Sequence, residues 1–116
     1  MRLIATAISF VLLFAAASAA RGAGCSQESD YARAVCLYRA GSFAEAEPLF
    51  AASAAAVASP ETIKAEYFLA RCRMKLGRFS DAAQGLMKIY SLDPSFYREW
   101  SCDFLLGECR KAMGLG

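Results

Sequence analysis

A repeat constrains the fold of this 116-residue chain more than any other feature of its sequence. Gly41, Gly77 and Gly114 occupy one repeat position, at spacings of 36 and 37 residues. After each of the first two glycines an aromatic residue follows two positions later, and an alanine follows three positions after that. Self-similarity with such a period is typical of stacked supersecondary units. We therefore predict a solenoid of about two and a half repeats.

Each repeat is predicted to be a helical hairpin that turns at its glycine. Apolar residues recur at helical spacing over residues 67–74 and 82–89. Glycine adopts positive φ without strain and so ends the first helix of each pair. Ser59-Pro60 and Asp93-Pro94 join a capping oxygen to a proline that the first helical turn tolerates, which predicts helix starts. Pro48 falls about one turn inside the second helix of the first repeat, where it should loosen that turn.

These patterns resemble the tetratricopeptide repeat over roughly residues 28–114. The residues that carry the resemblance are Ala34, Gly41, Phe43, Ala46 and Phe50 in the first unit, Leu69, Ala70, Gly77, Phe79, Ala82, Leu86 and Pro94 in the second, and Leu106, Gly107 and Gly114 in the third. The first unit departs from the family pattern at its end, where Ser53 and Ala58 stand. The resemblance implies an all-α, helix-turn-helix solenoid without catalytic activity, whose first helices line a concave groove.

By this resemblance the groove would bind a peptide or a helix of another protein. The residues expected at or near it are Tyr31, Arg39, Tyr67, Arg71, Lys75, Trp100 and Phe104. Aromatic rings flanked by cations suit a ligand that carries some acidic residues. The alternative is that the tyrosines only pack between helices. The family's carboxylate clamp of Lys, Arg and Asn is excluded, because the sequence contains no Asn.

Residues 95–113 are predicted to form one last helix with two apolar faces. One face would hold Cys102, Leu105, Leu106, Cys109 and Met113, and the other Phe96, Tyr97, Trp100 and Phe104. A helix that only capped the stack should be polar outside. We therefore expect the aromatic face to be covered by the lead segment, by a second subunit docking on Phe96, Trp100 and Phe104, by a ligand, or by a further helix.

The amino terminus has the layout of a secretory signal. Residues 1–20 contain one charge, an apolar run and a small-residue end, which predicts cleavage after Ala20. An uncleaved anchor is the alternative, because the apolar stretch just reaches spanning length. Ala23-Gly24-Cys25 ends like a bacterial lipoprotein box, so lipidation of Cys25 is a second way to reach a membrane. We divide the chain into a signal peptide (1–20), a polar lead (21–27) and a repeat domain (28–116).

The five cysteines show no C-x-x-C spacing, so they do not predict a redox motif or a zinc site. Cys36 is expected to be a small buried hydrophobe. Cys72, Cys102 and Cys109 can be read in the same way. The alternative is a disulfide of Cys72 with Cys102 or Cys109, since neighbouring helices can bring these together. Cys25 would then be left for a lipid or for an intermolecular bond.

Composition excludes several functions. The absence of His excludes a Ser-His-Asp or Cys-His relay and any imidazole zinc site. The formal net charge is only +2, with basic and acidic residues intermixed, so no nucleic-acid partner is expected. We predict neither cofactor nor metal.

The second unit and the chain's end resemble the C-terminal repeats of Tol-Pal system accessory proteins. They also resemble outer-membrane assembly lipoproteins of the same repeat type. The matching residues are 60–70, Leu76-Gly77, Leu106-Gly107 and Met113-Gly114. The resemblance implies an exported scaffold, periplasmic or outer-membrane associated, that binds another envelope protein. The alternative is a self-associating or truncated structural fragment with no separate ligand.

Overall fold

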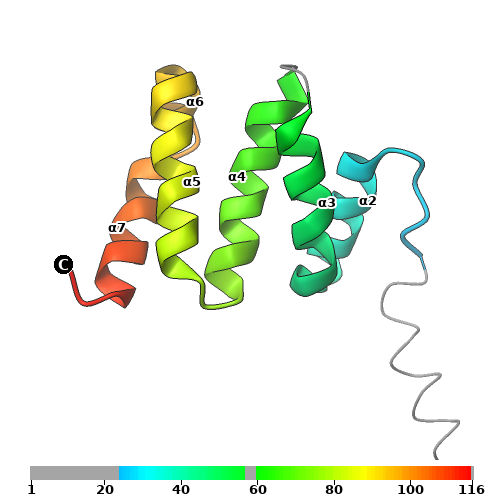
Figure 1. Cartoon of the computed structure of the whole chain (residues 1–116), viewed down its shortest axis with the longest axis horizontal. Helices are drawn as coiled ribbons and strands as arrows, with labels where there is room; N and C mark the ends of the chain where they lie inside the picture. Colours follow the sequence, from blue (N-terminus) through cyan, green and yellow to red (C-terminus); the bar gives the residue numbers. More distant parts are fainter. Residues whose placement is uncertain (1–23, 57–59, 116) are drawn as a thin grey trace, which may run out of the picture.

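The computed structural model describes residues 24–56 and 60–115, and over these residues it contains helices and no strand. The helices are α2 (Asp30–Arg39), α3 (Phe43–Ala55), α4 (Pro60–Lys75), α5 (Phe79–Leu92), α6 (Pro94–Glu99) and α7 (Cys102–Ala112). Figure 1 shows them side by side in chain order, each hairpin packed on the next. The predicted all-α solenoid is confirmed.

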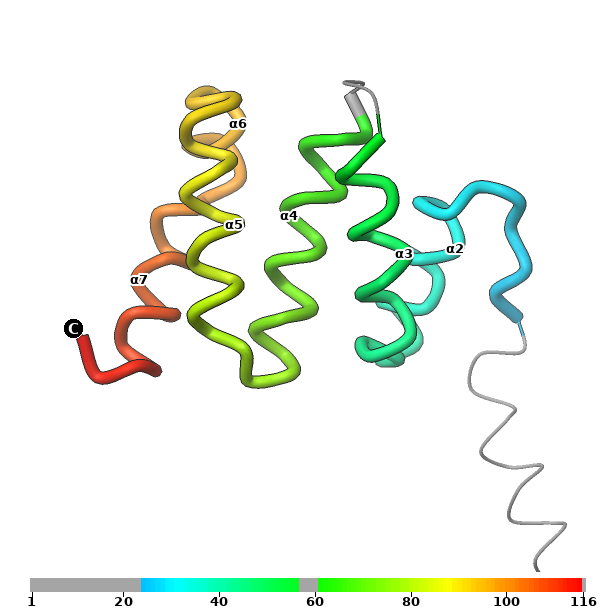
Figure 2. Tube along the Cα trace, viewed as in Figure 1, coloured from blue at the N-terminus to red at the C-terminus, as the bar shows by residue number. Residues whose placement is uncertain are grey.

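The repeat glycines end the first helix of each pair, as predicted. Gly41, Gly77 and Gly114 have φ values of 81°, 79° and 76°, a region that favours glycine. In each case the residue after the glycine donates its N–H to the carbonyl five residues before it, as Arg78 does to Arg73 over 2.7 Å. This bond closes the helix end and turns the chain into the next helix, which gives the zigzag path in Figure 2.

The prolines also lie where the sequence places them. Pro94 opens α6, and the carboxylate of Asp93 accepts the N–H of Phe96 over 3.0 Å. Pro60 opens α4, whereas its expected cap, Ser59, lies outside the described residues. Pro48 lies inside α3, which continues through it to Ala55.

Two clusters of buried side chains form the core. One joins α2, α3 and α4 around Leu37, Phe50 and Leu69, and the other joins α4 to α5, α6 and α7 around Leu86 and Ile89. Phe68 of α4 packs against both clusters. The central helix α4 therefore couples the two ends of the solenoid.

The prediction of one helix over residues 95–113 is wrong, because the chain breaks between α6 and α7. Ser101 adopts the left-handed conformation, with φ 52° and ψ 40°. The break turns the rings of Phe96 and Trp100 onto Tyr67, at centroid distances of 6.1 and 5.0 Å. The same change of direction lets α7 pack its own apolar side against α5.

Because of this break, the four aromatic residues predicted to share one apolar face do not remain together on it. Phe96, Tyr97 and Trp100 are half-buried against their own chain, and Phe104 alone of the four is exposed, at 65%. Most of the face is thus covered without a second subunit or a ligand.

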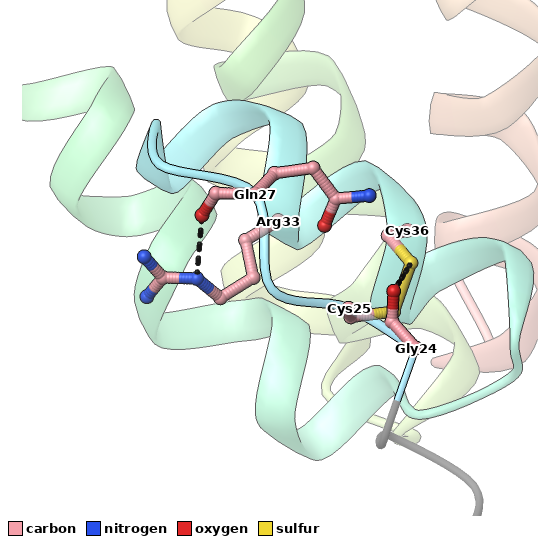
Figure 3. The surroundings of a disulfide bond; sticks show 5 residues. All are labelled: Gly24, Cys25, Gln27, Arg33 and Cys36. Atoms are coloured by element: carbon pink, nitrogen blue, oxygen red, sulfur yellow. Dashed lines mark hydrogen bonds between the residues drawn. A yellow bond between two sulfur atoms is a disulfide. The ribbon is translucent and has the colours of Figure 1, made fainter.

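The prediction for Cys36 and the alternative of a Cys72 disulfide are wrong, whereas the burial of Cys72, Cys102 and Cys109 agrees with the other reading. Cys25 and Cys36 form a disulfide, shown in Figure 3, while Cys72, Cys102 and Cys109 are buried free thiols. The lead segment folds back along α2, which brings Cys25 to Cys36, with 5.6 Å between their Cα atoms. A sulfur in a disulfide cannot also carry a thioether, so this bonded state excludes lipidation of Cys25.

The described helices include none that is both long and apolar enough to cross a membrane. The predicted signal peptide, residues 1–20, lies outside the described residues, as does the start of the lead.

Candidate peptide-binding groove

The first helices of the repeats line an open hollow of about 680 Å³. We use "the hollow" for this space. Its walls include Tyr31, Val35 and Arg39 from α2, Glu61, Lys64 and Phe68 from α4, and Trp100 from the end of α6. α2 and α4 are the first helices of their hairpins, and α6 together with α7 takes the corresponding place in the third repeat. The hollow is therefore where a solenoid of this type presents its concave surface.

Buried rings hold the aromatic walls of the hollow in place. Phe50 is completely buried, with the ring of Phe68 stacked on it at 5.5 Å and Tyr31 meeting it edge-on at 6.1 Å. Trp100 stacks on Phe96 at 4.6 Å and meets Tyr67 edge-on at 5.0 Å. Because each wall ring rests on other rings, the apolar surface is preorganised for a ligand.

Neither basic side chain of the hollow has a carboxylate within ion-pair distance in the described residues. Arg39 and Lys64 form no ion pair within the described structure. By contrast, Arg73, Arg78 and Lys88 each pair with a carboxylate of another helix. Unpaired cations beside aromatic rings can meet acidic groups of a ligand without first breaking an internal pair.

One carboxylate also lies at the hollow. Burial raises the pKa of the Tyr31 hydroxyl; the Glu61 carboxylate adds to this rise, and the Arg39 guanidinium opposes it. Glu61 and Arg39 therefore both lie close enough to the Tyr31 hydroxyl to act on it. With Lys64 included, the hollow carries two basic groups and one acidic group.

The remaining residues expected at the groove lie around the hollow or away from it. Tyr67 is only 8% exposed and belongs to the core, and its hydroxyl accepts a hydrogen bond from Arg71 over 3.0 Å. Lys75 is exposed, with its ammonium 6.0 Å from the centre of the Phe43 ring. Phe104 is exposed on α7 but does not line the hollow.

Sequence reasoning missed several lining residues, chiefly Lys64 and Phe68 on α4. A helical pattern points to them, since Lys64, Phe68, Arg71 and Lys75 follow one another at spacings of four, three and four residues. Residues so spaced share one helical face. Gln27 of the lead and Cys36 of α2 were missed too, because no local pattern places the lead against α2.

Neither a metal site nor a cofactor site stands out. Within residues 24–56 and 60–115, no three His, Cys, Asp or Glu side chains gather in a way that could hold a metal ion. The hollow contains one carboxylate, two cations and no nucleophile beside a base.

Comparison with known proteins identifies the architecture by sequence as well. A family model described as tetratricopeptide repeat matches residues 37–95, from the last residues of α2 to the start of α6. Searches of the curated proteins and of the solved structures found no match.

Proposed function

Since the chain belongs to the tetratricopeptide repeat family, whose members mediate protein–protein interaction, we propose that it is a non-catalytic adaptor whose hollow binds a peptide segment bearing acidic residues. The observation that carries this proposal is the pair of unpaired cations, Arg39 and Lys64, beside fixed aromatic rings. A ligand segment would bury apolar side chains on Tyr31, Phe68 and Trp100 and place its carboxylates near the two cations.

We further propose that the adaptor works outside the cytoplasm, in the periplasm or at the outer membrane, with another envelope protein as its partner. Two features support export: the signal-like pattern of residues 1–20 and the Cys25–Cys36 disulfide. Disulfides persist in oxidising compartments and are rare in the cytosol. From the sequence resemblance to scaffolds of the bacterial envelope, we propose that the adaptor organises other envelope proteins.

Peptide binding to the purified protein tests the groove. The probe is a fluorescein-labelled peptide, selected from a random phage library against the oxidised protein. Its binding is followed by the change in fluorescence of Trp100, the only tryptophan in the sequence. We expect selected peptides to contain Asp or Glu beside aromatic residues. We expect Lys64→Glu to weaken binding at least tenfold, an effect that rising salt should reduce.

Lys111→Glu is the matched control. Lys111 is exposed on α7, lies away from the hollow and makes the same charge change. Equal losses in the two variants would show that overall charge governs binding, and would contradict a role for the hollow.

Crosslinking in the native cell tests the partner. A photoreactive residue at Lys64 faces the hollow, whereas the same residue at Ser80, exposed on α5, does not line it. We expect one envelope protein to be captured from position 64, not from position 80, and to be lost when Arg39→Glu is added. Capture of this same chain alone would favour the self-associating alternative over the adaptor.

A further inference from the structure

Residues 24–27, the described part of the lead segment, form part of the wall of the hollow. Gln27 lines the hollow together with Tyr31 and Arg39 of α2. Cys36, the partner of Cys25 in the disulfide, also lines it. The proposed binding surface is therefore built from the repeats and from a non-helical segment that precedes them.

Two attachments hold this segment against α2 (Figure 3). The disulfide fixes Cys25, and the Cys36 sulfur lies 3.9 Å from the carbonyl oxygen of Gly24. Beyond Gln27, the guanidinium of Arg33 donates to the carbonyl oxygens of Gln27 and Glu28, over 3.1 and 3.5 Å. Gln27 thus lies between a covalent attachment and a polar one.

The covalent attachment is the stronger of the two. The hydrogen bonds from Arg33 are exposed, so water replaces them at little cost, and the contact between Arg33 and Asp30 spans 3.9 Å at the surface. Without the disulfide, Cys25 would lose its fixed place against the core cluster around Phe50. The position of Gln27 consequently depends on the redox state of two sulfurs.

Thiol–disulfide exchange in the described part of the chain is confined to this pair. Cys25 and Cys36 are both partly accessible, while the thiols of Cys72, Cys102 and Cys109 are fully buried. Burial raises the pKa of the Cys72 thiol to about 12, which suppresses its reactive thiolate. A mild reductant would therefore act on the disulfide of the lead segment and leave the buried thiols unchanged.

We propose that the Cys25–Cys36 disulfide holds the lead segment in the wall of the hollow, so that thiol–disulfide exchange at this pair switches the affinity of the hollow for its acidic peptide. This inference rests on the proposed function. In the reducing direction, a dithiol attacks one sulfur as a thiolate and breaks the S–S bond, and its second thiol releases the resulting mixed disulfide. Two electrons pass to the protein, Cys25 and Cys36 each gain a proton, and the dithiol becomes a disulfide.

The test compares binding of one peptide to three forms of the protein. The probe is the fluorescein-labelled peptide selected on the oxidised protein. The forms are oxidised wild type, wild type treated with a dithiol, and the double variant Cys25→Ser, Cys36→Ser. We expect affinity to fall at least fivefold in both forms without the disulfide, and the double variant to be insensitive to the dithiol. Affinities within twofold of each other in all three forms would overturn the proposal.

A point variant with the disulfide intact keeps the test independent of folding. Gln27→Glu adds a negative charge to the wall of the hollow and should weaken binding of the acidic peptide severalfold. Ser26→Glu is the matched control, because Ser26 is exposed and adjacent but does not line the hollow. Equal affinities in Gln27→Glu and Ser26→Glu would contradict a lead segment in the binding surface.

Lys64→Glu separates the two ideas. If Lys64→Glu abolishes binding but loss of the disulfide does not change it, peptide binding at the hollow is supported and its control by the disulfide is refuted. If Lys64→Glu leaves binding unchanged, the proposed function itself fails, and the switch fails with it.

Discussion

Replacing Phe50 with alanine should lower the free energy of unfolding and remove the packing that supports the aromatic walls of the hollow. Phe50 is completely buried in α3, and its ring lies 5.5 Å from Phe68, 6.1 Å from Tyr31 and 6.4 Å from Tyr38. Truncation of a buried phenylalanine costs roughly 3–5 kcal/mol, and the cost rises with the cavity left behind. Three neighbouring rings, each held by further contacts, limit collapse into the cavity, so we expect about 4 kcal/mol.

That loss is large for a domain of this size, whose stability is of the order of 5–15 kcal/mol. Urea unfolding followed by far-UV circular dichroism measures it, and thermal unfolding should show a fall of roughly 15–30 °C in Tm. Two wall residues of the hollow, Tyr31 and Phe68, would lose their support, so peptide binding should weaken even at temperatures where the variant is folded.

Phe104→Ala is the matched control for this experiment. The same side chain is removed from α7, where it is 65% exposed, so the change in unfolding free energy should stay within about 0.5 kcal/mol. A loss below about 1.5 kcal/mol for Phe50→Ala, or equal losses for the two variants, would refute the packing argument.

Three further predictions concern the turns and the sulfurs. Gly77→Ala should destabilise the protein by about 1 kcal/mol, because φ at Gly77 is 79°. Gly107→Ala should stabilise it by about 0.5–1 kcal/mol, because Gly107 lies within α7 and nothing is within 4 Å of the added Cβ. Urea unfolding measures both changes, and changes of the same sign would contradict the different roles of the two glycines. Reduction of the Cys25–Cys36 disulfide, which links residues 11 apart, should cost about 3 kcal/mol, and a loss below about 1 kcal/mol would contradict it. Burial, aided by the Glu47 carboxylate, raises the pKa of the Cys72 thiol from 9.0 to about 12. Because the thiol loses its proton at lower pH in the unfolded chain than in the folded one, the free energy of unfolding should fall as pH rises from 9 towards 12. The fall, measured by urea unfolding across this pH range, should be less steep in Cys72→Ala.

Much of the fold could be predicted because its signals are local. The positive φ at Gly41 and Gly77 follows from the residue type and its place after an apolar helical pattern. The start of α6 follows from Asp93 and Pro94, which are adjacent in sequence. Repetition of these signals at one period then predicts that the hairpins stack.

The hollow could be predicted only in part. Three of the residues expected at the groove, Tyr31, Arg39 and Trp100, line the hollow together. Tyr67 occupies the equivalent repeat position, yet it is buried, because α6 folds its rings over it. Equivalent positions in a repeat differ in exposure when their neighbours differ.

By itself, the sequence determined where the hairpins turn, that α4 and α6 begin at Pro60 and Pro94, and that the helices pair into stacked hairpins. These properties depend on backbone preferences and side-chain caps that act within a few residues. The tertiary structure alone decided three others: the break at Ser101, the pairing of Cys25 with Cys36, and the surface on which Arg39 and Lys64 meet. Each joins elements through packing that no local pattern encodes. Ser101 adopts a left-handed backbone conformation, and on either side of it the rings of α6 pack on Tyr67 while the apolar side of α7 packs on α5. This packing offsets the backbone cost at Ser101.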